Sequence, residues 1–111
     1  MSLLIGTGRG QGDRSARAPV RVLDGRRDYP SLVPGEIAVL KRPDSELVIW
    51  LDRLSGIITR SGGIGAHLAL IALEGGIPYL VLQEEFGNGL RTGVEVVMDP
   101  VKGTVHLVES V

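Results

Sequence analysis

The sequence predicts a compact domain of the α/β or β/β/α class, on three observations. Its 111 residues, 43% hydrophobic and 23% charged, suit one globular domain with a single main core. Short apolar runs bounded by turn-forming residues predict about seven strands, and two segments with helical spacing predict two helices. No linker, repeat or low-complexity segment interrupts the chain, so we expect residues 1–111 to form a single domain.

The expected strands are short and apolar, and glycine, proline or charged residues bound them. In chain order they are Leu3–Ile5, Val20–Leu23, Glu36–Leu40, Gly56–Thr59, Pro78–Leu82, Val94–Asp99 and Gly103–Val108. The last two are separated only by Pro100–Lys102, which predicts a hairpin. Asp24–Pro34 and Gln83–Gly93 are rich in turn-forming residues and are expected to be loops.

Two helices are expected between these strands. Asp44–Leu54 carries apolar residues at every third or fourth position, and either Asp44 or Ser45 can cap its first turn. Trp50, the only tryptophan, is expected to pack in this helix rather than to contact a ligand. The second helix is expected from about Ala66 to Glu74, because glycines flank an apolar segment there.

The glycine-rich segment Gly6–Ala18 has two interpretations. A phosphate-binding loop fits poorly, because Gln11 and Asp13 occupy the positions where a dinucleotide motif starting at Gly6 or Gly8 needs its last glycine. A flexible loop is therefore the expected structure. Four arginines in or next to the segment leave anion binding open as an alternative: Arg9, Arg14, Arg17 and Arg21.

Charge and composition exclude several classes of function. The net charge of −1 and the isoelectric point near 6.1 give no electrostatic basis for binding nucleic acid or an anionic membrane. The absence of cysteine excludes disulfides and thiolate metal sites. No apolar run reaches the roughly 18 residues that cross a bilayer, and the first residues do not resemble a signal peptide. A cytoplasmic location is expected.

Ser61–Pro78 is the stretch most suggestive of chemistry. Its glycines allow unusual backbone angles and leave room for a ligand just before the helix. Unpaired N–H groups at a helix N-terminus favour phosphate and disfavour a protonated imidazole. His67 would therefore be a neutral imidazole beside a phosphate-binding helix end, which suits a phosphoryl nucleophile. A surface or capping histidine is the simpler alternative, and composition alone favours it.

Other polar residues are weaker candidates. Glu74 lies on the same helix face as His67 but roughly 10 Å along the axis, too far for a direct bond. His106 alternates with apolar neighbours in the last strand and is expected to face solvent. The sequence shows neither a cluster with metal-ligand spacing nor a G-x-S-x-G nucleophile motif.

At this stretch the chain resembles the mobile, swivelling phosphohistidine domain of phosphoenolpyruvate-utilising enzymes, such as phosphoenolpyruvate synthase and pyruvate phosphate dikinase. Gly56–Thr59, the pair Gly62–Gly63 and His67 match the core of the family motif in order and spacing. The matching residues that follow are Ala69, Ile71, Ala72, Glu74, Gly76, Ile77 and Pro78. Further similarity at 34–39 and 89–105 extends the resemblance from about Leu3 to Leu107.

The resemblance implies a swivelling β/β/α domain that carries a phosphoryl group on His67 between two active sites. The phosphate-binding residues expected around it are Thr59, Gly62, Gly63, Gly65 and Ala66. Nucleotide-binding and pyruvate- or phosphoenolpyruvate-binding domains, in the same or a separate chain, would be its partners. Mg²⁺ and ATP or phosphoenolpyruvate would bind there, with no metal or cofactor in this chain. The domain would be one component of a phosphotransferase that does not turn over alone, and homodimerisation stays open.

The chain departs from the family motif at two places. Gly65–Ala66 replaces the family's Thr-Ser pair before the histidine, and Leu73 replaces an arginine, a loss for which Arg60 could compensate. Two other functions are therefore kept beside the phosphoryl carrier. One is a binding or regulatory module that has lost phosphotransfer, and the other is a free-standing binder of small anions.

Overall fold

The computed structural model describes residues 2–61, 67–83 and 90–108. Seven strands form a closed barrel in the order β1-β5-β4-β3-β2-β6-β7. Their bounds are β1 Ser2–Gln11, β2 Ala16–Leu23, β3 Ile37–Leu40, β4 Gly56–Thr59, β5 Tyr79–Leu82, β6 Glu95–Asp99 and β7 Thr104–Val108. The helical elements are the 3₁₀ helices η1 Arg26–Ser31 and η2 Ser45–Arg53 and the α-helix α1 His67–Glu74. The predicted α/β class is confirmed.

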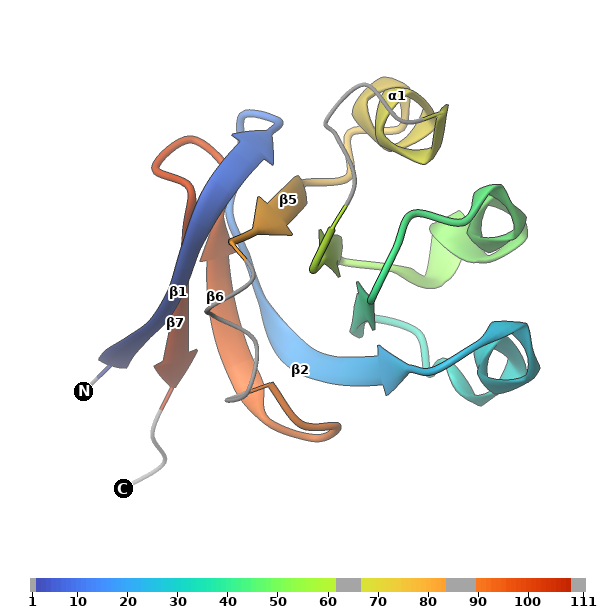
Figure 1. The fold of residues 1–111 in the computed structure, drawn as a ribbon, viewed down its shortest axis with the longest axis horizontal. Helices are drawn as coiled ribbons and strands as arrows, with labels where there is room; N and C mark the ends of the chain where they lie inside the picture. Colours follow the sequence, from blue (N-terminus) through green and yellow to red (C-terminus); the bar gives the residue numbers. More distant parts are fainter. Residues whose placement is uncertain (1, 62–66, 84–89, 109–111) are drawn as a thin grey trace.

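The barrel has a parallel part and an antiparallel part. Strands β2, β3, β4 and β5 pair in parallel, and each pair of consecutive strands is joined through one helical element. The antiparallel part consists of β1, β6 and β7, with the predicted hairpin formed by β6 and β7. Figure 1 shows η1, η2 and α1 on one side of the parallel strands, away from β1, β6 and β7.

Side chains alternate between two cores along the parallel strands. In β4, Ile57 packs among the helices, whereas Ile58 packs inside the barrel with residues such as Met98. Both isoleucines are fully buried. Burial on both faces explains why β3 and β4 are continuous apolar runs without polar alternation.

The expectation of a flexible loop over Gly6–Ala18 was wrong. Most of that segment belongs to β1 and β2, whose glycines permit close backbone contact. A Cβ atom on Gly8 would lie 1.9 Å from the carbonyl oxygen of Val81, and one on Gly10 would lie 2.0 Å from that of Pro100. The glycines serve strand packing, because any side chain there would collide with backbone.

Each predicted helix is present, with a difference in type. Residues 45–53 form a 3₁₀ helix instead of an α-helix, and the predicted cap is confirmed because the Asp44 carboxylate accepts a hydrogen bond from the Glu46 N–H. Part of the expected loop over Asp24–Pro34 is η1, which was also missed. Trp50 packs against the helix-side core, as predicted, with the Arg53 guanidinium 5.1 Å from its ring.

Helix α1 buries three residues and ends at a glycine pair. Leu68, Ala69 and Ala72 are buried against the sheet and η2. The Ile77 N–H donates to the Ala72 carbonyl at 2.8 Å, and Gly76 adopts a φ of +74°. This left-handed glycine satisfies the last carbonyls of the helix and turns the chain into β5. No helix in the described ranges is long and apolar enough to cross a bilayer.

Candidate phosphoryl-transfer site

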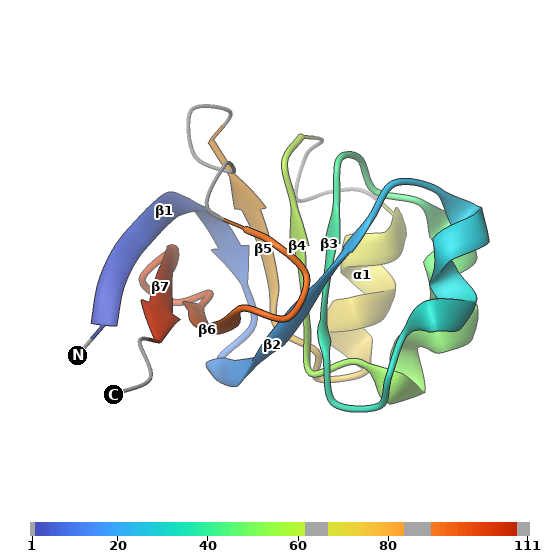
Figure 2. The ribbon, with the colours of Figure 1, turned by 90° about the horizontal axis from the view of Figure 1, so that it is seen from below.

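The parallel strands bring several predicted residues to one edge of the sheet. Strands β2, β3 and β4 end at this edge with Leu23, Leu40 and Thr59. Helix α1 begins there and runs back along the sheet (Figure 2). We call this edge of the sheet, where β2, β3 and β4 end, the carboxyl edge. In both open and barrel-shaped α/β folds, ligands bind preferentially at the carboxyl ends of the parallel strands.

His67 is the first residue of α1, a helix that the sequence predicted from about Ala66, and its side chain is exposed. Among the described residues it has no hydrogen-bond or ion-pair partner. Its imidazole is therefore accessible to a partner molecule, and it lies beside the unpaired N–H groups of the first helical turn. The role of His67 as nucleophile stays a prediction.

Thr59 occupies the last position of β4 and is completely buried. Like Ile57, it faces the helix side of the sheet, where Tyr79 from β5 also lies. The two hydroxyls are near enough to interact, but neither forms a regular hydrogen bond with a described group. Burial raises the pKa of Tyr79, and its contact with Thr59 has a smaller, opposite effect. Thr59 therefore lies beneath the site, and its contact with phosphate stays a prediction.

The other four predicted phosphate-binding residues lie outside the described residues. They are Gly62, Gly63, Gly65 and Ala66. The chain on both sides of them is described, and it fixes where the segment starts and finishes. It leaves β4 through Arg60 and Ser61 and re-enters at His67, so both of its ends are at the carboxyl edge.

Hydrogen bonds hold the ends of β3 and β4 together at this edge. The Arg60 N–H donates to the Leu40 carbonyl at 3.0 Å, and the Ser61 hydroxyl donates to the Lys41 carbonyl at 2.7 Å. Arg60, the residue expected to compensate for Leu73, is half-buried beside this junction. Its proposed compensation stays a prediction.

The weaker candidates lie elsewhere. Glu74 is exposed at the far end of α1. His106 is half-buried in the antiparallel part, on the opposite face of β7 from Val105, and pairs with Leu4 and Val97. In the part of the chain that the structure describes, no three His, Asp or Glu side chains are arranged to hold a metal ion.

The four arginines near the N-terminus do not gather around an anion site. Arg17 forms an ion pair with Glu95 at 3.0 Å, and Arg21 forms one with the buried Glu36 at 3.1 Å. Arg9 is exposed on β1, and Arg14 is exposed in the turn between β1 and β2. The alternative of an arginine-lined anion site in this segment is therefore not supported.

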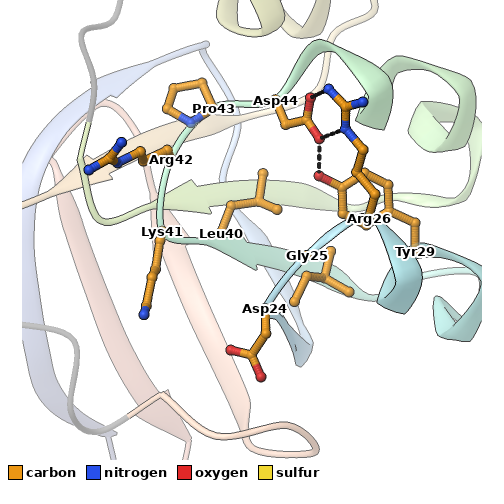
Figure 3. Close-up of a pocket in the computed structure, with 10 residues that line it drawn as sticks. Asp24, Gly25, Arg26, Tyr29, Leu40, Lys41, Arg42, Pro43 and Asp44 are labelled. Atoms are coloured by element: carbon orange, nitrogen blue, oxygen red, sulfur yellow. Dashed lines mark hydrogen bonds and ion pairs between the residues drawn. The ribbon is translucent and has the colours of Figure 1, made fainter.

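Two groups near the carboxyl edge were missed in the sequence. The first is a structural cluster in which Asp44 accepts hydrogen bonds from the Arg26 guanidinium at 2.9 and 3.0 Å and from the Tyr29 hydroxyl at 2.6 Å (Figure 3). Hydrogen bonding from Arg26 is the main reason why the pKa of Asp44 is lowered to about 2. The cluster joins η1 to η2. No local motif shows it, because Arg26 and Tyr29 lie 18 and 15 residues before Asp44.

The second group missed is the cationic pair Lys41 and Arg42. Both side chains are exposed immediately after β3, next to the end of β4. A signal for them was available, because a Lys-Arg pair directly follows a predicted buried strand and precedes Pro43.

Comparisons with known proteins agree with the fold and the motif. The family model of the PEP-utilising enzyme mobile domain matches residues 32–103. The chain is 27% identical over 104 residues to a pyruvate kinase of Bacillus licheniformis, covering 93% of this chain and 18% of that protein. It is 35% identical over 72 residues to a phosphoenolpyruvate synthase of Aeropyrum pernix, covering 65% of this chain and 9% of that protein. The chain thus spans less than a fifth of these relatives.

A solved structure shows the same fold at low identity. Aconitase X of Thermococcus kodakaraensis aligns with a TM-score of 0.70 and 19% identity, over 98% of this chain and 99% of that chain. This likeness concerns the fold alone. The family match covers β3, β4, α1 and β5 together with His67, so this chain belongs to the family of the mobile domain of PEP-utilising enzymes.

Proposed function

We propose that this chain is a phosphoryl carrier domain and that His67 forms the phosphohistidine. The observation that carries the proposal is the position of His67 in a domain of this family. It is exposed on the first turn of α1, where the sheet's carboxyl edge meets the helix N-terminus. The family membership supports a role in phosphotransfer, and the histidine is the group suited to carry the phosphoryl.

The transfer step needs a neutral imidazole nitrogen. Its lone pair attacks the phosphorus of the donor, a P–N bond forms, and the P–O bond to the leaving group breaks with its electron pair going to that oxygen. The reverse reaction delivers the phosphoryl group to an acceptor. Backbone N–H groups of the first turn of α1 stabilise the added negative charge.

The donor and acceptor sites belong to partner domains in this proposal. The relatives named phosphoenolpyruvate synthase and pyruvate kinase are at least five times longer than the matched segment, so further domains accompany it there. ATP or phosphoenolpyruvate, with Mg²⁺, would bind in those partner domains. This chain would carry the phosphoryl group between them and would not turn over alone.

Labelling of the chain in its native cells tests the proposal. We expect the chain purified under alkaline conditions to carry an acid-labile, base-stable phosphoryl group, located on His67 by mass spectrometry. The His67→Ala variant should lose it. His106→Ala is the matched control, because it removes the other histidine from the antiparallel part and should keep full labelling. Equal labelling of His67→Ala and the parent would exclude His67 as the carrier.

One observation favours a second candidate function, a binding or regulatory module without phosphotransfer. Leu73, which stands where the family has an arginine, is 48% exposed on α1, and Leu70 is 49% exposed. This surface of α1 is apolar where the family motif is cationic, so it suits contact with another protein. In this case the parent would never be labelled, and binding to a partner would survive His67→Ala. A phosphorylated His67 would exclude this candidate.

A further inference from the structure

A cationic pocket lies at the carboxyl edge, between the ends of β3 and β4. Its lining residues are Lys41, Arg42, Arg60 and Ser61. Three of these four side chains are cationic, and the chain continues from Ser61 toward His67. None of these four residues is among those that match the family motif, which include the histidine, the glycines and their apolar neighbours.

Two of the cations, Lys41 and Arg42, form no ion pair with the described residues. Among the described residues, ion pairs join Arg17, Arg21 and Arg26 to carboxylates, but none involves Lys41 or Arg42. Neither side chain donates a hydrogen bond to a described group, and both are exposed. Two adjacent cations without a carboxylate partner create a positive potential at the carboxyl edge, and this potential favours the binding of an anion.

The backbone around the pocket is fixed even though the cationic side chains are exposed. The Ser61 hydroxyl donates its proton to the Lys41 carbonyl, and the Arg60 N–H donates to the Leu40 carbonyl. These bonds hold the cations of two neighbouring strands at one place. Ser61 therefore acts as a positioning residue, because its proton is already used and is not available to a ligand.

The nearby carboxylates reduce the positive charge at Lys41 more than at Arg42. The Asp44 carboxylate already accepts hydrogen bonds from Arg26 and Tyr29. Asp24 lines the adjoining pocket together with Lys41, and Figure 3 shows both side chains extending to the same side. Arg42 extends away from both carboxylates (Figure 3). The positive potential of the pair is thus expected to be strongest around Arg42.

We propose that Lys41, Arg42 and Arg60 form an anion subsite that binds a phosphate group of the molecule exchanging its phosphoryl group with His67. Arginine and lysine are the side chains that recognise phosphate, and arginine does so through paired N–H donors. This inference rests on the proposed function in one respect: the bound phosphate is taken to belong to the phosphoryl donor or acceptor of His67. The anion subsite itself can be tested without labelling.

The test is an NMR titration of the full 111-residue chain with inorganic phosphate, and separately with pyrophosphate, at constant ionic strength. We expect chemical-shift changes at the backbone amides of Arg42, Arg60 and Ser61. The double variant Lys41→Gln/Arg42→Gln should raise the Kd for either ligand about tenfold. Arg14→Gln/Lys102→Gln is the matched control, because it removes one arginine and one lysine from exposed turns outside the carboxyl edge.

The outcomes separate a built subsite from diffuse attraction. Equal weakening by both double variants, or shifts spread evenly over the surface, would overturn the subsite, as would the absence of any shift in the parent. Asp24→Asn should tighten binding, because it removes a nearby negative charge.

The same experiments separate the subsite from the carrier function. His67→Asn should still bind phosphate, although it cannot be labelled. Phosphate binding without labelling at His67 would retain the subsite and reject the carrier function. Labelling without localised binding would do the reverse.

Discussion

Two sets of cations in this domain have different surroundings. Arg21 and Arg26 point to carboxylates that hold elements of the barrel and its helices together, with Arg21 next to the nearly buried Glu36. Lys41 and Arg42 have the same chemistry but no carboxylate partner among the residues described. The first set stabilises the fold, and the second stands at the carboxyl edge, where we propose that phosphate binds. Residue type alone does not distinguish the two sets. What distinguishes them is whether a described carboxylate lies within ion-pair distance.

The largest expected effect is on the buried ion pair. Replacing Arg21 with methionine leaves Glu36 charged, with its side chain only 8% exposed. We expect the free energy of unfolding to fall by about 3 kcal/mol, because an unpaired buried carboxylate is costly. Urea unfolding measures this change. Arg17→Met is the control, since its pair with Glu95 is exposed and should contribute at most about 1 kcal/mol. Equal losses in the two variants would remove the distinction between buried and exposed pairs.

The next effect is the pH dependence carried by Asp44. Its pKa of about 2 in the folded chain lies below the ordinary 3.8, so the carboxylate stabilises the fold fully above about pH 4. This stabilisation is lost as the pH falls through 2. Asp44→Asn should cost about 2 kcal/mol at pH 7 and much less near pH 2. Thermal unfolding of parent and variant across this range measures the difference, and a pH-independent gap would contradict the assignment.

The smallest expected effect is on the edge cations. Lys41→Gln/Arg42→Gln should change the free energy of unfolding by no more than about 0.5 kcal/mol, because both side chains are exposed and without a carboxylate partner among the described residues. Urea unfolding under the conditions used for Arg21→Met allows direct comparison. A loss as large as that of Arg21→Met would place Lys41 and Arg42 among the structural cations and sharply weaken the case for an anion subsite.

Much of the fold was predicted correctly from the local sequence. The buried strands β3, β4 and β5 were predicted because they are unbroken apolar runs between glycines, prolines and charges. The flanking glycines predicted a helix from about Ala66 to Glu74, and α1 spans His67–Glu74. The structure adds the parallel pairing, which places Thr59 and His67, two of the predicted site residues, at the carboxyl edge.

The errors came from contacts between distant segments. The glycines of β1 resemble those of a loop until the backbones of β5 and the β6–β7 turn are placed against them. Similarly, nothing near Asp44 in the sequence indicates that Arg26 and Tyr29 will reach it. Helical periodicity relates residues three or four positions apart, whereas these contacts join residues that are 15 or more positions apart in the sequence.

The sequence by itself determined the family, the apolar strands and the place of His67, because these depend on residue type and spacing along the chain. The tertiary structure decided which charges are structural and which are not. It pairs Arg21 with Glu36 and Arg26 with Asp44, and it brings together Lys41, Arg42 and Arg60, which follow the ends of β3 and β4. The physical reason is that electrostatic energy depends on distance and burial, and the folded chain sets both.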